Sequence, residues 1–117
     1  NQVSVHEIVG DVEGRVCLLV DDLIDTGSTI AKAAEALKAN GATGVVVAAT
    51  HAVFSEPAAE VLQSNFIDEV VVTDTLPLPA SKRWKQLTVL PIAPLLARAI
   101  REVFDDGSVT SLFDGAA

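Results

Sequence analysis

The sequence predicts an α/β protein in which helices cover both faces of a parallel sheet. Short runs of Val, Leu, Ile and Ala alternate along the 117 residues with segments whose apolar residues recur at helical spacing. The runs at 16–20 and 45–49 are continuous, which is typical of strands buried on both faces of a sheet. Strands that alternate with helices in this way form parallel sheets.

The expected elements follow in a regular order. Residues 3–9 alternate loosely and are expected to form a strand near a sheet edge. Asn40 and Gly41 end the first expected helix, and Pro57 stands in the first turn of the second, where a residue without an N–H group is tolerated. After the strand at 3–9 we expect strands at 16–20, 45–49, 69–73 and 87–90, and helices at 29–39, 57–64 and 92–104.

Composition narrows the class of protein. Half of the residues are hydrophobic and 21% are charged, as in globular chains. The formal net charge of −8 argues against nucleic acid or anionic membranes as partners. No apolar run approaches the roughly 20 residues that span a bilayer. The single cysteine, Cys17, lies in an apolar run, excludes an internal disulfide and favours a cytoplasmic protein.

The loops that follow the expected strands are polar. "DDLIDTGST", "THAVFSEP" and "TDTLPLP" are all rich in acids or hydroxyl groups. In open parallel sheets, ligands bind outside the carboxyl ends of the strands. We therefore expect the polar residues of these loops to converge on one site.

The segment "DTGST" has the composition of a cradle for one phosphate monoester. Gly27 permits a tight turn, Thr26, Ser28 and Thr29 offer hydroxyl groups, and the following helix offers its first N–H groups and the positive end of its dipole. Ordinary capping of that helix by Ser28 or Thr29 is the alternative interpretation. Neither residue is followed three positions later by the Glu or Gln of a capping box.

Asp21 and Asp22 come directly after the apolar run 16–20, and both are expected to turn into the cleft as the strand ends. Paired carboxylates accept hydrogen bonds from vicinal hydroxyls and hold Mg²⁺ together with substrate oxygens. A solvated acidic turn is the alternative. A sugar phosphate has an anionic end, which suits the phosphate cradle, and a diol, which suits the acids.

At these residues the sequence resembles a known family. Four apolar residues, two acids and "DTGST" resemble the phosphoribosyl-pyrophosphate (PRPP) motif of phosphoribosyltransferases and ribose-phosphate pyrophosphokinases. The segments "ATHAVFSEPAAEVL", "IDEVVVTDTLPLP", "APLLARAI" and "SVTSLF" are similar to the C-terminal half of bacterial ribose-phosphate pyrophosphokinases. This resemblance implies a Rossmann-like parallel sheet with flanking helices, of the type I phosphoribosyltransferase kind. It implies that residues 1–117 are one C-terminal domain of a longer chain whose N-terminal half is absent.

The resemblance also implies an activity, the Mg²⁺-dependent transfer of the diphosphoryl group of ATP to the 1-hydroxyl of ribose 5-phosphate, giving PRPP and AMP. The resemblance implies that most ATP contacts and the catalytic Lys and Arg lie in the absent part, so we assign no catalytic residue here and expect the isolated chain to be inactive. The implied substrate-binding residues are Asp21, Asp22, Asp25, Thr26, Gly27, Ser28 and Thr29, and the implied metal ligands are Asp21 and Asp22.

Near the C-terminus, Ser108, Val109 and Thr110 resemble the family's Ser-Val-Ser stretch. In the family this stretch lies at a subunit interface of a hexamer built from dimers and contacts phosphate or ADP as allosteric regulators. A polar tail that merely docks is the alternative. Two other functions stay open: a phosphoribosyltransferase, for which no base-binding segment is visible, and a non-catalytic regulatory subunit of a PRPP synthetase.

The chain departs from the family pattern at Ser28, Ala52 and Glu56, where glycine is more common. These departures affect the geometry of the loops. His51 is interpreted as a hydrogen-bonded structural residue, with a ligand role as the alternative. The basic residues around Trp84 are interpreted as a solvated loop tip, with a nucleotide site as the alternative; they are Lys82, Arg83 and Lys85.

Overall fold

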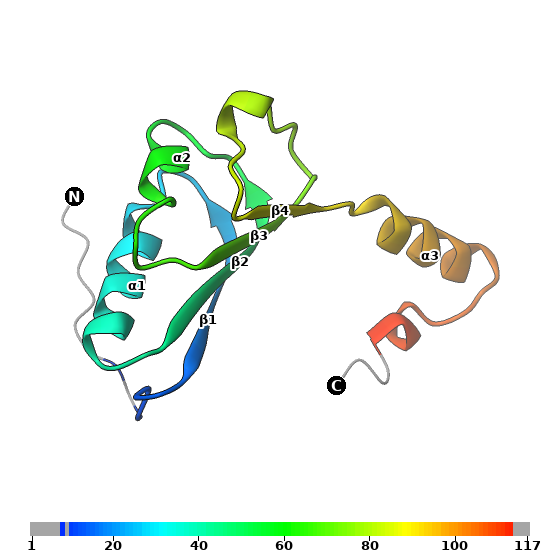
Figure 1. Cartoon of the computed structure of the whole chain (residues 1–117). Coiled ribbons are helices and arrows are strands. Elements are labelled where there is room, and N and C mark those ends of the chain that lie inside the picture. Colours follow the sequence, from blue (N-terminus) through cyan, green and yellow to red (C-terminus); the bar gives the residue numbers. More distant parts are fainter. Residues whose placement is uncertain (1–7, 9, 114–117) are drawn as a thin grey trace.

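The computed structural model describes residue 8 and residues 10–113 (Figure 1). They form a parallel sheet with three α-helices, which confirms the predicted α/β class. The strands are β1 (Val16–Ile24), β2 (Gly44–Ala52), β3 (Glu69–Thr73) and β4 (Leu87–Leu90), and the helices are α1 (Ser28–Ala39), α2 (Ala58–Val61) and α3 (Ala93–Phe104). Short 3₁₀ turns lie at Ala80–Lys82 and Val109–Phe113. The strand expected at 3–9 falls outside the described residues, apart from Ile8, which has no regular structure.

The strands lie side by side in chain order, β1-β2-β3-β4, and every pair is parallel. One row of paired residues crosses the whole sheet, namely Leu19, Val47, Val70 and Leu87. Because all strands run in the same direction, their carboxyl ends lie at the same end of the sheet. The three polar loops identified in the sequence leave the sheet at this end.

One face of the sheet carries the core. Helices α1 and α2 lie on this face (Figure 1). Val45, Val47 and Val70 are completely buried beneath them, and Phe54 and Leu62 are each 1% exposed. Burial of these side chains supplies the main free-energy gain of folding, at about 25 cal/mol for each Å² of apolar surface removed from water.

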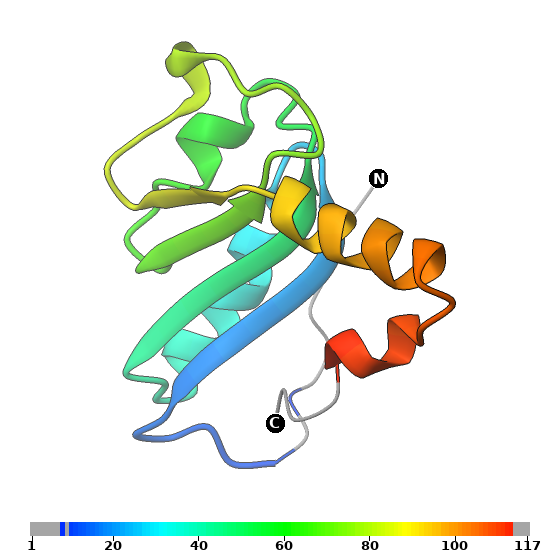
Figure 2. The same cartoon turned by 90° about the vertical axis from the view of Figure 1, so that its right-hand side faces the viewer.

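The opposite face is not covered, so the expectation of helices on both faces is wrong for the described part of the chain. Val16, Leu18 and Val20 alternate along β1 with half-buried residues and are 68%, 61% and 73% exposed. Helix α3 leaves the end of β4 and stands away from the sheet (Figures 1 and 2). The continuous apolar run 16–20 is therefore buried on one side only. No helix among the described residues is long and apolar enough to cross a membrane.

Three element boundaries differ from the prediction in ways that affect the loops: β1 and β2 are longer than expected and α2 is shorter. β1 continues to Ile24, because Leu23 and Ile24 pair with His51 and Ala52 of β2. Asp21 and Asp22 consequently lie within a strand and not after it. The helix expected at 57–64 is a single turn, Ala58–Val61.

Candidate functional site

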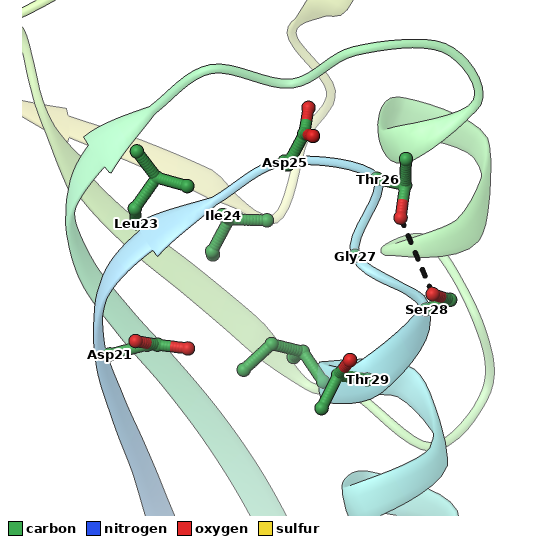
Figure 3. A pocket seen from close by; sticks show the side chains of 9 residues that line it. Asp21, Leu23, Ile24, Asp25, Thr26, Gly27, Ser28 and Thr29 are labelled. Atoms are coloured by element: carbon green, nitrogen blue, oxygen red, sulfur yellow. Dashed lines mark hydrogen bonds between the residues drawn. The ribbon is translucent and has the colours of Figure 1, made fainter. Parts of the chain in front are cut away.

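A cavity of about 200 Å³ lies where β1 passes into α1 (Figure 3). Polar side chains and the loop backbone form most of its wall. Its lining residues are Asp21, Leu23, Ile24, Asp25, Thr26, Gly27, Ser28, Thr29 and Ile30. The fold thus gathers every predicted substrate-binding residue except Asp22 around one cavity.

Gly27 sets the shape of this loop. Its backbone has φ +81° and ψ 0°, a left-handed conformation that glycine adopts without steric strain. It is the N-cap residue of α1, and its carbonyl oxygen accepts the first helical hydrogen bond, from the Ala31 N–H, at 2.9 Å. No side chain caps this end of the helix, which excludes the capping interpretation of Ser28 and Thr29.

The N–H groups of the first turn of any helix have no acceptor within the helix, and in α1 no capping side chain accepts hydrogen bonds from them. Residues 28–30 carry these donors and line the cavity. The hydroxyl groups of Thr26 and Ser28 lie 3.3 Å apart, and Ser28 and Thr29 are exposed. Amide and hydroxyl donors beside the positive end of a helix dipole form a suitable site for a phosphate group.

The aspartates take three different positions. Asp21 lines the cavity and extends across it toward Thr29, whereas the Asp25 carboxylate points away from Thr29 and Ser28 (Figure 3). Asp22 does not line the cavity, and its N–H donates to Asp21 Oδ1 at 2.8 Å. The expectation that both Asp21 and Asp22 turn into the cleft is wrong, because β1 continues through them and adjacent strand residues point to opposite faces.

The Asp21 and Asp25 carboxylates in the cavity wall are the side chains of this site that could contribute to holding a metal ion. The described residues contain no cluster of three His, Cys, Asp or Glu side chains that could hold a metal ion. Mg²⁺ needs only one or two protein carboxylates when water and substrate phosphate oxygens complete its coordination. The Asp21 carboxylate in the cavity wall meets this smaller requirement.

Hydrogen bonds join the loops after β2 and β3 to each other at the same end of the sheet. His51 Nδ1 and Thr75 Oγ1 are 2.7 Å apart, and Thr73 Oγ1 donates to the Thr50 carbonyl oxygen at 2.7 Å. These bonds agree with the interpretation of His51 as a hydrogen-bonded structural residue. None of these residues lines the cavity next to α1, but Thr50 and Thr73 line a second depression of about 220 Å³ together with Asp21.

The basic loop has a structural role that the sequence did not reveal. Lys82 Nζ donates to the Phe54 carbonyl oxygen at 2.8 Å, and Arg83 Nε donates to the Leu78 carbonyl oxygen at 3.1 Å. Lys82 is half-buried, so the prediction of a solvated loop tip is wrong for this residue, whereas Arg83 and Lys85 are exposed as predicted. The Lys82 contact spans 28 positions, and no local pattern in the sequence indicates it.

The residues with a predicted regulatory role lie far from the cavity. Val109 and Thr110 belong to the 3₁₀ turn beyond α3, and Ser108 precedes it (Figure 1). All three are exposed, and the Ser108 carbonyl oxygen accepts a hydrogen bond from Ser111 Oγ at 2.6 Å. The described structure does not bring them together with the cavity next to α1.

Comparison with known proteins gives the family of this chain. The family model described as phosphoribosyl synthetase-associated domain matches residues 3–114. The ribose-phosphate pyrophosphokinase of Streptomyces avermitilis is 62% identical over 97% of this chain, and that of Mycobacterium leprae is 57% identical over all of it. The chain spans only 35% and 36% of the length of these relatives.

A solved structure agrees with this comparison. The crystal structure of phosphoribosylpyrophosphate synthetase from Mycobacterium smegmatis matches 85% of the chain with a TM-score of 0.79 and 56% identity, and the match covers 33% of that protein. Both the sequence and the fold lead to one conclusion: this chain belongs to the phosphoribosyl synthetase-associated domain family.

Proposed function

We propose that this chain is the ribose 5-phosphate-binding domain of a ribose-phosphate pyrophosphokinase, and that it forms the C-terminal part of the longer protein. The whole enzyme would transfer the diphosphoryl group of ATP to the 1-hydroxyl of ribose 5-phosphate, releasing AMP and giving PRPP. The observation that carries the proposal is the uncapped start of α1, whose free N–H groups line a polar cavity. The names of the relatives support the choice of reaction.

The two ends of the substrate would meet different parts of the cavity. The 5-phosphate would lie against the N–H groups of residues 28–30 and the hydroxyl groups of Thr26, Ser28 and Thr29. The ribose hydroxyls would donate hydrogen bonds to the Asp21 carboxylate on the opposite wall. This arrangement separates the negative phosphate from the acid and holds the sugar in a fixed orientation, which is the main protein contribution in phosphoryl transfer.

Asp21 is the residue of this chain that would hold Mg²⁺ from inside the cavity, and Asp22 is a second candidate beside it. When bound, the metal would neutralise the charge that develops on the phosphate oxygens during transfer. The nucleophile is the substrate's own 1-hydroxyl, so this chain needs to supply no nucleophilic side chain.

We propose that the chain is inactive on its own. No Lys or Arg lines the cavity, and a triphosphate transition state requires such cations for charge stabilisation. The remaining part of the longer protein would supply them together with most ATP contacts. We also propose that Ser108, Val109 and Thr110 bind phosphate or ADP in the full-length cytoplasmic homo-oligomer, at a site distinct from the cavity. Their exposure and their distance from α1 are consistent with this role.

Isothermal calorimetry on the chain tests the proposed substrate. We expect ribose 5-phosphate to bind and ribose to bind much more weakly, because the phosphate supplies most of the contacts; Mg²⁺ should tighten the binding. Thr29→Val removes a hydroxyl from the cavity at nearly constant volume and should weaken ribose 5-phosphate by about tenfold. Thr88→Val removes an exposed hydroxyl from β4, outside the cavity, and should leave binding unchanged. Equal affinity for ribose and ribose 5-phosphate, or PRPP formation from ATP by this chain alone, would contradict the proposal.

A further inference from the structure

The turn that follows β2 holds a carbonyl group at the base of the cavity next to α1. The N–H groups of Val53 and Phe54 both donate to the Ile24 carbonyl oxygen, at 3.0 and 3.1 Å. Ile24 is the last residue of β1, is 1% exposed and lines the cavity directly before Asp25 (Figure 3). The position of Phe54 therefore affects the point at which the loop between β1 and α1 begins.

The backbone of Phe54 has an unfavourable conformation. Its φ is +50°, in the left-handed region, where a residue with a bulky side chain is a steric outlier. A residue keeps such a conformation only where its surroundings hold it there, and residues of this kind are concentrated at functional sites. The contacts that hold Phe54 are thus the contacts that keep this turn in place.

Two residues of the loop between β3 and β4 make these contacts. The Lys82 ammonium group donates to the Phe54 carbonyl oxygen at 2.8 Å, and the ring centroids of Phe54 and Trp84 are 5.9 Å apart. A charged donor forms a stronger hydrogen bond than a neutral one, and the ring separation is that of a favourable aromatic pair. Because Phe54 is 1% exposed, water has little access to compete for its carbonyl oxygen.

We propose that Lys82 is a positioning residue for ribose 5-phosphate, an inference that rests on the proposed function. Its bond to Phe54 keeps the turn closed on Ile24 and so keeps the donors of the loop between β1 and α1 in place. Lys82 does not line the cavity, and its ammonium group is engaged at Phe54, so it acts without touching the ligand.

The proposal has a direct consequence for affinity. Without the Lys82 ammonium group, Phe54 leaves the left-handed region more often, and the N–H groups that hold the Ile24 carbonyl oxygen turn away with it. The loop is then correctly placed in a smaller fraction of the molecules. The apparent affinity for ligand falls in proportion to that fraction.

Calorimetry with ribose 5-phosphate on Lys82→Met tests this consequence. The substitution removes the ammonium group and keeps a long side chain; because Lys82 is half-buried, the variant should fold, which urea unfolding checks. We expect the dissociation constant to rise by about tenfold, within the range of couplings between packed residues. Lys82→Arg keeps a charged donor and should restore most of the affinity. Lys85→Met removes the same charge from an exposed position of the same loop and should bind as the wild type does.

Amide hydrogen exchange, followed by NMR on the ligand-free chain, tests the route through the turn. The N–H groups of Val53 and Phe54 should exchange at least about fivefold faster in Lys82→Met, because local opening governs their exchange. The N–H groups of residues 46–49, in the middle of β2, should change much less. A merely structural role of Lys82 would accelerate both groups alike and leave the affinity unchanged.

The outcomes separate this inference from the proposed function. A wild-type chain that binds no ribose 5-phosphate would contradict the proposed function and this inference with it. Wild-type binding that Lys82→Met leaves intact, or that Lys85→Met weakens equally, would overturn this inference alone. So would a loss of affinity in Lys82→Met without faster exchange at Val53 and Phe54.

Discussion

Gly27 lies directly against Leu62. A Cβ atom added to Gly27 would be 3.1 Å from both Cγ and Cδ2 of Leu62, a side chain that is itself 1% exposed. The loop between β1 and α1 thus contacts the hydrophobic core through a residue with no side chain. This contact sets the distance between the loop and the core. It therefore also sets the position of the free N–H groups of α1.

The first prediction concerns Gly27→Ala. A left-handed backbone costs a residue with a Cβ about 1–2 kcal/mol, and here the new methyl group must also displace the loop from Leu62. We expect the free energy of unfolding to fall by more than this strain cost. We also expect ribose 5-phosphate binding to weaken by about a hundredfold. Urea unfolding and calorimetry measure the two effects.

Gly14→Ala is the matched control for this variant. Gly14 also has a positive φ, +74°, but no atom lies within 4 Å of an added Cβ. It should therefore show the strain cost without the steric displacement, and unchanged ligand binding. Equal losses of stability in the two variants would show that the contact with Leu62 has no energetic consequence.

The second prediction separates the two neighbouring acids of β1. Asp21 lines the cavity and Asp22 does not. Asp21→Asn should therefore remove most of the effect of Mg²⁺ on ribose 5-phosphate binding, while Asp22→Asn should reduce it much less. Both substitutions remove one negative charge, so each serves as the other's control. Calorimetric titrations with and without Mg²⁺ measure the difference; an identical response of the two variants would contradict the assignment.

The third prediction concerns Asp25, whose side chain is exposed and has no hydrogen bond to any other described residue. Asp25→Ala should change the free energy of unfolding by less than about 0.5 kcal/mol, as is usual for surface substitutions. Any loss of ribose 5-phosphate affinity would then report a ligand contact and not a disordered loop. A large drop in stability in urea unfolding would instead assign Asp25 a structural role.

The fourth prediction is a pH dependence of stability. Asp68 Oδ2 accepts a hydrogen bond from the Val45 N–H at 2.7 Å and lies 3.3 Å from Lys38 Nζ. The backbone hydrogen bond, with a smaller contribution from Lys38, lowers the pKa of Asp68 below its ordinary value of 3.8. The unfolded chain therefore binds the proton more readily, so this stabilisation is complete above the ordinary pKa and is lost as pH falls through the folded one.

Asp68→Asn should remove this contribution. The Asp68 side chain is 52% exposed, so solvent screening limits the effect to about 1 kcal/mol or less. Unfolding free energies at neutral pH and through the acid range should show a shallower acid loss in the variant than in the wild type. Glu35→Gln removes the same charge from an exposed helical position and should keep the wild-type pH slope. Identical slopes for wild type and Asp68→Asn would contradict the prediction.

The sequence by itself determined the order of the described elements, and it predicted a phosphate site in the loop between β1 and α1. Apolar runs mark all four described strands, because burial against a neighbouring layer requires such residues wherever they lie. The glycine at position 27 and the hydroxyl groups around it indicate a phosphate loop, because their backbone freedom and donors are local properties.

Only the tertiary structure decided which side chains reach the site and which faces stay open. The sequence does not distinguish Asp21 from Asp22. Because Leu23 and Ile24 pair with β2, the strand continues through both acids, and their side chains point to opposite faces of the sheet. The apolar run 16–20 would suit a strand covered on both sides, yet the described helices cover only one. Register and coverage depend on contacts between residues far apart in the chain, so no local pattern could settle them.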